Sequence, residues 1–485
     1  MKLSEILQDL DGIRFHADAS MEIIGLENDS RAVKPGFAFV AVRGFETDGH
    51  KYIPQAVERG AAVVICEEAP TVEVPYVLVP DSRKALARTA CRFYGDPSSR
   101  MTVIGVTGTN GKTTTTYLVK HLLEEILHAK VGLIGTNGNM IGQETLHSER
   151  TTPESIELQR LFAQMLAAGC THVVMEVSSH ALDLGRVEGV HFAVGSFTNL
   201  TQDHLDYHKT MENYAAAKAK LFAVCTKAVI NLDDPWGQFM VDHANGETLT
   251  YGVTNPKADL RAEEIVHKAS GVTFRAVYKG ESVPVQLAIP GTFSVYNALG
   301  VLGNMLQLGI SLADSAKAMA TATGVKGRVE VVPTDGDYTI LIDYAHTPDA
   351  LDNVLTAMRE VTQGRLVVLF GCGGDRDRTK RPKMGKIAAE KADFVIVTSD
   401  NPRTEDPEAI ISEILAGMEH TRTPKQVICN RPEAIEWAIT HHQPGDVIIL
   451  AGKGHEDYQI IGKEKFHMDE REIVAEILKR RRENR

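Results

Sequence analysis

The most informative part of this chain is the stretch Gly105-Val106-Thr107-Gly108-Thr109-Asn110-Gly111-Lys112-Thr113-Thr114-Thr115. It follows an apolar run over 101–104 and precedes a largely apolar segment over 117–123, so it predicts a strand, a glycine loop and a helix in succession. Glycines let the backbone wrap around phosphate oxygens, and the new helix directs its free N–H groups and positive dipole end at them. Val106 stands where the general phosphate-loop pattern has its first glycine, so the spacing is a narrower variant of that pattern.

Two side chains of this loop and one distant carboxylate are suited to phosphate and metal chemistry. Lys112 can reach the terminal phosphates of a nucleotide, and the Thr113 hydroxyl can bind Mg²⁺. Glu176 ends a predicted strand over 171–176, and a carboxylate at the carboxyl end of a strand beside such a loop is a candidate Mg²⁺ ligand. His204 lies in a polar segment over 198–208, whose spacing leaves a metal contact and an ordinary polar loop equally open.

Size and composition bound the classes of protein to consider. With 485 residues the chain exceeds what one core usually supports. Its net charge of −12 argues against general binding to nucleic acid or to anionic membranes. The six cysteines form no CxxC pair, which predicts neither a zinc site nor a disulfide framework and fits a reducing compartment. Acidic residues in the first ten positions and the lack of a long apolar run favour a cytoplasmic protein without membrane insertion.

Alternating strand-like and helix-like segments predict an α/β protein of three domains. A cluster of Gly, Pro and Ser over 94–99 reads as a linker, and a polar–apolar alternation over 260–287 suggests a small antiparallel excursion. Four buried-type strands follow at 339–344, 365–370, 394–397 and 446–450. We therefore expect a smaller N-terminal α/β domain over 1–98, a central domain with a mostly parallel sheet over 99–330, and a Rossmann-like domain over 331–485.

The order of its motifs resembles that of the Mur ligases, the ATP-dependent amide-forming enzymes of peptidoglycan precursor synthesis. The motifs that carry the resemblance are GVTGTNGKTTT (105–115), MEVSSHAL (175–182), TNLTQDHLDYH (198–208), YAAAKAKLF (214–222), YNALGVLG (296–303), GRVE (327–330), DYAHTPDAL (343–351), GCGGDRDRTKRP (371–382), SDNPRTEDP (399–407) and AGKGHEDYQ (451–459). They span nearly the whole chain. They are most similar to those of the members that add the third residue to UDP-MurNAc-L-Ala-D-Glu, and the resemblance implies ATP as co-substrate, Mg²⁺ as cofactor and an acyl-phosphate intermediate.

The resemblance also implies roles for individual residues. The implied catalytic residues are Lys112, His204 and Lys218, and the implied metal contacts are Thr113, Glu176, His204 and Lys218, the last in carbamylated form. The implied ATP contacts are Gly108, Thr109, Asn110, Gly111, Lys112, Thr113, Thr114, Asn297 and Arg328, and those to the UDP-substrate are Ser30, Thr151, Thr152, Ser178 and Arg186. The residues alone do not choose between Lys218 and Lys220; only the family register Tyr-x-x-Ala-Lys-x-x-Leu-Phe selects Lys218. Asp343 and His346 lie at the family's hinge to the third domain.

The third domain is expected to choose between meso-diaminopimelate and L-lysine as the added amino acid. Diaminopimelate carries a second carboxylate, for which the planar two-pronged guanidinium of Arg is suited. Asp400-Asn401-Pro402-Arg403 has the form that resembles the diaminopimelate-adding members. The implied diaminopimelate contacts are Arg376, Asp400, Asn401, Pro402, Arg403, Gly452 and Glu456, with Glu456 suited to the ammonium group.

Three rival readings follow from the same loop. A sister ligase or a folylpolyglutamate synthetase would share the loop and the Lys218 region but not Asp29-Ser30-Arg31 or the motifs around 400 and 453. A phosphate-loop kinase or GTPase would need only the loop, and no Asn-Lys-x-Asp guanine signature occurs. A catalytically dead scaffold would have lost Lys112, Glu176 or Lys218, and all three are present. An active ligase, expected as a monomer, is the favoured interpretation.

Overall fold

The predicted strand, glycine loop and helix form the centre of the fold. In the computed structural model, which describes residues 1–44, 47–146, 148, 150–268, 270–322 and 324–483, β6 (Thr102–Thr107) leads through the loop into α4 (Lys112–Leu127). From Val103 to Thr107 every residue of β6 is buried, and the strand lies between β10 (His172–Glu176) and β11 (Phe192–Phe197), parallel to both. A strand buried on both faces explains the continuous apolar run that precedes the loop.

Chain contacts group the described residues into two units, 1–259 with 300–311, and 260–299 with 312–485. The first unit holds a five-stranded sheet in the order β1-β5-β4-β3-β2 and a larger sheet that includes the order β13-β12-β11-β6-β10-β7-β8-β9. The strands not yet given are β1 (Arg14–His16), β2 (Gly25–Glu27), β3 (Phe37–Val40), β4 (Val63–Cys66), β5 (Tyr76–Leu78), β7 (Val131–Ile134), β8 (Asn139–Ile141), β9 (Glu144–Leu146), β12 (Lys227–Asn231) and β13 (Glu247–Gly252). The helices are α1 (Leu3–Ile6), η1 (Gly49–Tyr52), α2 (Ile53–Glu58), α3 (Ser82–Phe93), η2 (Pro97–Arg100), α5 (Ser155–Ala167), α6 (Ser179–Asp183), α7 (Leu205–His208), α8 (Met211–Val224) and α9 (Gly237–Asp242).

Helices cover both faces of the larger sheet. Val103 of β6 and Val173 of β10 belong to an apolar core with Phe162 of α5 and Leu221 of α8, whereas the alternate strand residues are buried on the other face, where α4 packs. The strands from β7 to β13 that run through β10, β6, β11 and β12 are all parallel. Since the chain leaves β6 for β7 and later returns to its other side at β11, the carboxyl end of β6 is a topological switch point, where such sheets bind ligands.

The second unit contains the predicted antiparallel excursion and a doubly wound sheet. β14 (Leu260–Lys268), β15 (Gly271–Tyr278) and β16 (Glu281–Leu287) pair antiparallel, which confirms the expectation for 260–287. The sheet has the order β17-β18-β22-β19-β20-β21, in which all neighbours except β17 and β18 are parallel. Its strands are β17 (Glu330–Val332), β18 (Thr339–Asp343), β19 (Leu366–Phe370), β20 (Phe394–Val397), β21 (Lys425–Val427) and β22 (Val447–Ala451), beside a separate hairpin of β23 (Tyr458–Ile461) and β24 (Glu464–His467).

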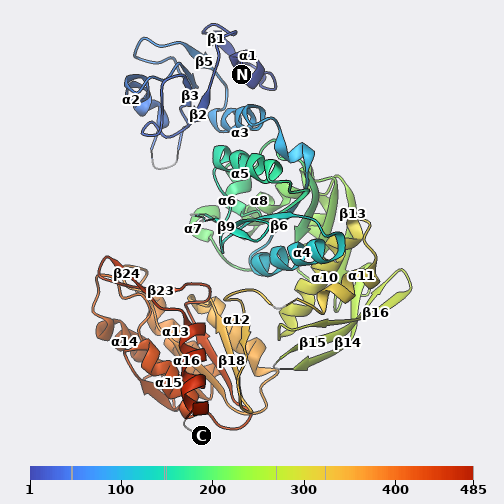
Figure 1. Ribbon diagram of the computed structural model, residues 1–485, viewed down its shortest axis with the longest axis vertical. Coiled ribbons are helices and arrows are strands. Elements are labelled where there is room, and N and C mark those ends of the chain that lie inside the picture. The colour runs from blue at the N-terminus through green and yellow to red at the C-terminus, as the bar shows by residue number, and fades with distance from the viewer. Residues whose placement is uncertain (45–46, 147, 149, 269, 323, 484–485) are drawn as a thin grey trace. The chain divides into compact units, whose positions relative to one another are not determined.

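Both faces of this second sheet are covered as well (Figure 1, orange to red). α12 (Pro348–Arg359), α13 (Lys380–Lys391) and α14 (Pro407–Ala416) pack on one face. α15 (Arg431–Thr440) and α16 (Glu470–Glu483) share an apolar core with the other face. The remaining helices are α10 (Thr292–Gln307) and α11 (Leu312–Met319). This arrangement confirms the predicted α/β class.

Two further features bear on expectations from the sequence: the segment over 94–99 and the length of the apolar helices. The predicted linker over 94–99 includes the start of a short 3₁₀ helix, η2, entered through Asp96 at φ 49°, because Pro97 can occupy the first turn of a helix without losing a hydrogen bond. No helix among the described residues is long and apolar enough to cross a membrane.

Candidate active site

The glycine loop is held by contacts to its own carbonyl oxygens. Lys112 Nζ donates to the carbonyl oxygens of Gly108 (2.9 Å) and Thr109 (2.8 Å), and Thr198 Oγ1 donates to that of Asn110 (2.6 Å). Gly108 has φ +149°, and a Cβ atom there would lie 1.9 Å from Thr198 Oγ1. The loop therefore needs glycine at this position both for its backbone conformation and for the close approach of the next strand end.

Glu176 lies at the carboxyl end of β10, beside the strand that enters the loop. Its side chain is 1% exposed, and Thr136 donates to both carboxylate oxygens, from its backbone N–H (3.0 Å) and from its hydroxyl (3.1 Å). Thr113 lies in the first turn of α4, directly after Lys112, and is also buried. These two of the four predicted metal contacts thus lie near the carboxyl ends of two adjacent parallel strands, β6 and β10, at the same edge of the sheet.

Lys218 and Lys220 differ in how far their side chains are buried. Lys218 is 1% exposed; its Nζ donates to the carbonyl oxygen of Gly108 (2.8 Å) and lies over the Tyr214 ring. Lys220 is exposed and forms an ion pair of 2.7 Å with Asp183. Burial, followed by the positive charge of Lys112, lowers the pKa of Lys218 well below its ordinary value. Of the two lysines, Lys218 is therefore the one whose amine is buried against the glycine loop.

His204 stands in a group of aromatic rings. It has φ +53°, its side chain is half exposed, and its Nε2 lies 3.3 Å from Asp203 Oδ2. Its ring meets that of His180 edge to face at 4.9 Å, and His180 in turn contacts the buried His208. Burial lowers the pKa of His208 to about 4, so this ring is neutral at pH 7. Of the His204 and His208 imidazoles, that of His204 is the more accessible.

The donor set fits Mg²⁺ although it forms no preformed cage. Among the described residues, no three His, Cys, Asp or Glu side chains come together as a metal site. Mg²⁺ is commonly bound by one or two carboxylates, with water and substrate phosphates completing its coordination. The Glu176 carboxylate and the Thr113 hydroxyl match that pattern, and a carbamate on the Lys218 amine would add a second carboxylate-like group.

A cavity of the first unit is lined by four arginines and two carboxylates. It contains Ser30 and Arg186 of the predicted UDP-substrate contacts. Its charged lining residues are Asp29, Arg31, Arg83, Arg150, Glu154 and Arg186. Ser30 is buried and its hydroxyl donates to Gln55 Oε1 (2.6 Å). The excess of guanidinium groups suits the phosphates of a nucleotide.

Three other predicted substrate contacts connect this cavity to Glu176. Arg186 Nη1 donates to the carbonyl oxygen of Thr152 (3.3 Å), and the Thr152 hydroxyl donates to the carbonyl oxygen of Glu176 (2.8 Å). The Ser178 backbone N–H donates to the same hydroxyl (3.1 Å). Thr151 Oγ1 lies 3.0 Å from the hydroxyl of Thr136, which holds Glu176. The structure thus brings these residues together in one hydrogen-bonded chain.

The predicted nucleotide contacts of the second unit include two with distinctive surroundings. Asn297, on α10, is buried. Arg328 stacks over the Tyr344 ring at 5.2 Å, and its Nε is buried without a hydrogen-bond partner among the described residues. Asp343 accepts hydrogen bonds from the backbone N–H groups of Val329 and Ala345 (both 2.8 Å), and burial raises the pKa of its carboxyl.

A second cavity opens at the carboxyl ends of four parallel strands, β18, β19, β20 and β22, in the second unit. It contains six of the seven predicted diaminopimelate contacts, namely Arg376, Asp400, Asn401, Arg403, Gly452 and Glu456; Pro402 is not among its lining residues. Other lining residues include Tyr344, His346, Gly371, Gly373 and Lys383. The loops after these strands therefore meet in the crevice where doubly wound sheets bind ligands.

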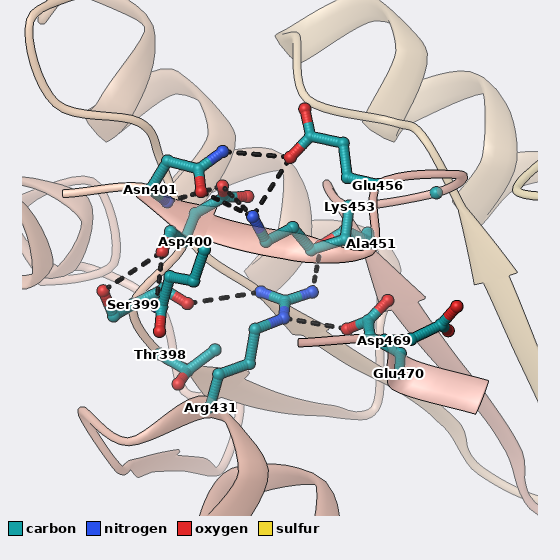
Figure 2. Close-up of polar contacts among 12 residues, drawn as sticks. Thr398, Ser399, Asp400, Asn401, Arg431, Ala451, Lys453, Glu456, Asp469 and Glu470 are labelled. Atoms are coloured by element: carbon teal, nitrogen blue, oxygen red, sulfur yellow. Dashed lines mark hydrogen bonds and ion pairs between the residues drawn. The ribbon is translucent and has the colours of Figure 1, made fainter. Parts of the chain in front are cut away.

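The charged groups of this cavity are held in defined positions. Arg403 adopts φ +52°, and its Nη1 donates to the carbonyl oxygen of Gly374 (2.8 Å). Arg376 is exposed, and its Nη1 donates to the Asp375 carbonyl oxygen. On the other side, Glu456 Oε2 accepts from Asn401 Nδ2 (3.0 Å) (Figure 2). Guanidinium and carboxylate groups in one cavity complement a zwitterionic amino acid with an additional carboxylate.

Some residues of these cavities were missed by sequence reasoning. Arg83 and Arg150 line the first cavity, and Lys453 lies behind the second with its side chain fully buried. Arg150 precedes the Thr151-Thr152 pair at a position where some members of the resembling family carry Asn, so the resemblance did not predict it as a contact. Arg83 sits on α3, far from every motif, so only the folded arrangement reveals it.

Comparison with known proteins assigns the family. The family models described as Mur ligase family, catalytic domain; Mur ligase middle domain; and Mur ligase, glutamate ligase domain match residues 22–94, 106–305 and 327–454. UDP-N-acetylmuramoyl-L-alanyl-D-glutamate–2,6-diaminopimelate ligases of Clostridium botulinum and Caldanaerobacter subterraneus are each 47% identical to the chain, over 99% of it and 100% and 99% of the respective relative. A solved structure of a ligase of the same name has a TM-score of 0.76 at 33% identity and covers 99% of both chains. The chain therefore belongs to the Mur ligase family.

Proposed function

We propose that this protein joins meso-diaminopimelate to UDP-MurNAc-L-Ala-D-Glu while ATP is converted to ADP and phosphate. The observation that carries the proposal is the cavity of the second unit, where Arg376 and Arg403 occur together with Asp400 and Glu456. The two relatives described above carry the diaminopimelate ligase name, which supports the same assignment. A lysine side chain would leave the guanidinium of Arg403 without its carboxylate partner, which disfavours lysine as the substrate.

The proposed reaction has two steps. The D-Glu side-chain carboxylate attacks the γ-phosphorus of ATP, ADP leaves, and an acyl phosphate forms. The amine of diaminopimelate, after losing a proton, attacks the acyl carbon, and the tetrahedral intermediate expels phosphate to leave the amide. The first step brings an anion against an anion, so the site must supply positive charge and oriented donors.

Residues of the glycine loop are proposed to supply that charge. Lys112 would exchange its contacts with the loop carbonyl oxygens for the terminal phosphates, while the N-terminus of α4 directs N–H groups at them. Thr113 and Glu176 would hold Mg²⁺, with His204 near a second ion. The bound Mg²⁺ would offset the repulsion between carboxylate and polyphosphate. Further ATP contacts are proposed from Gly108, Thr109, Asn110, Gly111, Thr114, Asn297 and Arg328.

Lys218 is proposed to act as a carbamate. Its neutral amine can add CO₂ with loss of one proton, which converts a nitrogen base into an anionic oxygen donor. The lowered pKa and nearly complete burial of the amine support this step, because a protonated amine would not react. The hydrogen bond to the Gly108 carbonyl oxygen supports a position next to the phosphates.

The first cavity is proposed to bind the UDP-substrate. Ser30 and Arg186 line it. Ser30 would contact the nucleotide, and Thr151, Thr152, Ser178 and Arg186 would contact the muramoyl-dipeptide. Arg186 supports this proposal because its Nε is buried without a hydrogen-bond partner among the described residues.

We further propose that the chain has three domains, over 1–98, 99–330 and 331–485, and that the protein is a monomer. We also propose that it works in the cytoplasm, a location supported by six cysteines without a disulfide.

Mass spectrometry of the product tests the proposal. The purified protein is incubated with UDP-MurNAc-L-Ala-D-Glu, ATP, Mg²⁺ and meso-diaminopimelate, and parallel reactions lack one component each. The expected product has the summed mass of the two acceptor substrates less one water, and it forms only in the complete mixture. Consumption of ATP without this product would contradict the proposed ligation.

A further inference from the structure

Lys453 is a fully buried ammonium at the back of the second cavity. Its side chain is 0% exposed, and it is absent from the residues that line the cavity. Its Nζ donates to Asn401 Oδ1 (2.6 Å) and Glu456 Oε2 (3.1 Å) (Figure 2). It also donates to the carbonyl oxygen of Tyr458 (2.6 Å). An ammonium has three protons, so these contacts account for all of them and offset the cost of burying the charge.

The contact with Lys453 fixes the orientation of the Asn401 amide. Asn401 Oδ1 accepts from Lys453 Nζ and also from the backbone N–H of Ile460 (2.9 Å). With its oxygen held by two donors, the amide must turn its NH₂ group the other way, and Asn401 Nδ2 donates to Glu456 Oε2 (3.0 Å). Asn401 is 4% exposed. It therefore acts as a rigid bridge between the buried ammonium and the carboxylate of the cavity.

One oxygen of the Glu456 carboxylate accepts hydrogen bonds from both Lys453 and Asn401. Oε2 accepts from Lys453 and from Asn401, whereas Oε1 has no hydrogen-bond partner among the described residues, and Glu456 lines the cavity. Lys453 Nζ also lies 3.6 Å from Asp400 Oδ1. One buried cation thus faces two carboxylates. Lys453, Glu456 and Asp400 together carry one net negative charge, which suits an incoming ammonium group. Glu456 Oε1 is the oxygen that remains to accept a hydrogen bond from that ammonium.

We propose that Lys453 is a positioning residue for the amino-acid substrate. It acts through Asn401 and Glu456, so that Glu456 Oε1 is presented to the ammonium group of the substrate in a single direction. This inference rests on the proposed function, because it assigns the ammonium to diaminopimelate. It adds to that function a residue that touches no substrate and still sets the affinity for the amino acid.

A Lys453→Met variant tests the inference through separate Michaelis constants for the three substrates. We expect the KM for diaminopimelate to rise about 10- to 100-fold, because hydrogen bonds that involve a charged group and orient Glu456 are lost. The KM values for ATP and for UDP-MurNAc-L-Ala-D-Glu should stay close to those of the unchanged protein. Lys386→Met is the matched control. Lys386 is an exposed lysine on α13, and its Nζ forms a long ion pair of 3.7 Å with Glu390 Oε1. It should change none of the three constants.

A double-mutant cycle with Glu456→Gln separates positioning from a general structural effect. If Lys453 acts through Glu456, Lys453→Met should raise the KM for diaminopimelate much less in the Glu456→Gln background than in the unchanged protein. Equal effects in both backgrounds would overturn the inference. So would a Lys453→Met variant that raises all three KM values alike.

An isosteric variant keeps the inference testable if Lys453→Met does not fold. Asn401→Asp retains an oxygen for Lys453 but replaces the amide donor to Glu456 with a second carboxylate oxygen. A rise of about 10-fold or more in the KM for diaminopimelate alone would support the bridge, and an unchanged KM would overturn it. If the unchanged protein does not turn over diaminopimelate at all, the proposed function fails and the inference fails with it. If it does and the variants behave like the control, only the inference fails.

Discussion

The amine of Lys218 donates a hydrogen bond of 2.8 Å to the carbonyl oxygen of Gly108 and so joins α8 to the glycine loop. A helix-surface lysine would ordinarily be a solvated cation, but this one is buried beneath the loop that we propose binds ATP. A second amine lies close by, because Lys112 Nζ donates to the same carbonyl oxygen at 2.9 Å. Burial, and after it the positive charge of Lys112, lowers the pKa of Lys218 well below its ordinary value.

Removal of the Lys218 amine should abolish ligation. In Lys218→Ala we expect kcat to fall at least about 100-fold, because a group that holds charge in the transition state is lost. Short carboxylic acids such as formate or acetate should partly restore activity by supplying the missing carboxylate. Lys220→Ala, two positions along the same helix, is the matched control and should retain activity, since Lys220 is exposed. Full activity of Lys218→Ala would remove the carbamate from the mechanism.

Buried Lys218 should also cost the protein stability at neutral pH. The pKa of Lys218 is lowered in the folded protein from an ordinary value of 10.5. At a pH between the lowered pKa and the ordinary one, the unfolded chain therefore binds a proton that the folded chain does not. Stability from this group therefore falls as the pH drops below 10.5. Lys218→Met should melt at a higher temperature than the unchanged protein at pH 7 in CO₂-free buffer, and the difference should shrink as the pH rises. A difference independent of pH would contradict this account.

A methyl group at position 108 should disturb the glycine loop. In Gly108→Ala the new Cβ would lie 1.9 Å from Thr198 Oγ1, at φ +149°, and such backbone strain costs about 1–3 kcal/mol. We expect the KM for ATP to rise at least about 5-fold from that strain. Gly185→Ala is the control, because Gly185 also has positive φ, +66°, but no atom lies within 4 Å of its Cβ position. Equal ATP constants for the two variants would argue against the close contact.

The buried ion pair beside the second cavity should matter for stability. Arg431 and Glu470 are both 0% exposed, with Nε and Oε1 2.8 Å apart, and Arg431 also donates to the carbonyl oxygen of Ala451 (2.8 Å) (Figure 2). Arg431→Met should lower the free energy of unfolding by about 3–5 kcal/mol, since Glu470 is left buried without its partner. Urea unfolding measures this loss. Arg431→Met combined with Glu470→Leu should recover part of it, and a double variant as unstable as the single one would contradict the explanation.

An exposed pair provides the control for that measurement. Arg480 Nη1 lies 3.4 Å from Glu436 Oε1, and both side chains are about half exposed. Arg480→Met should cost less than about 1 kcal/mol, because water already screens this interaction.

Motifs and periodicity were sufficient to predict much of the fold. The antiparallel excursion begins and ends at Leu260 and Leu287 as the alternation indicated, and the four apolar runs after 338 all form parallel strands. These features could be predicted because each depends on local patterning and on burial. Strand order could not, since the insertion of β22 between β18 and β19 brings together segments about a hundred residues apart.

The candidate site was predictable where a motif carried it and not elsewhere. Residues 400–403 and 452–456 were singled out by resemblance, and the structure places both at one cavity. Lys453 lies within the second motif, yet nothing in the chain indicates that its ammonium faces away from the cavity and toward Asn401. The choice of Lys218 over Lys220 likewise becomes physical only through burial in the fold. Side-chain direction and desolvation are three-dimensional properties, and a single sequence contains no direct record of them.

We expect the protein to ligate diaminopimelate and not lysine. Phosphate release from ATP is measured with Mg²⁺ and UDP-MurNAc-L-Ala-D-Glu, with either meso-diaminopimelate or L-lysine as the amine. We predict turnover with diaminopimelate and none above background with lysine, because the guanidinium of Arg403 requires a carboxylate partner. Comparable turnover with lysine would contradict the specificity assigned to this cavity, and turnover with neither would contradict the ligase itself.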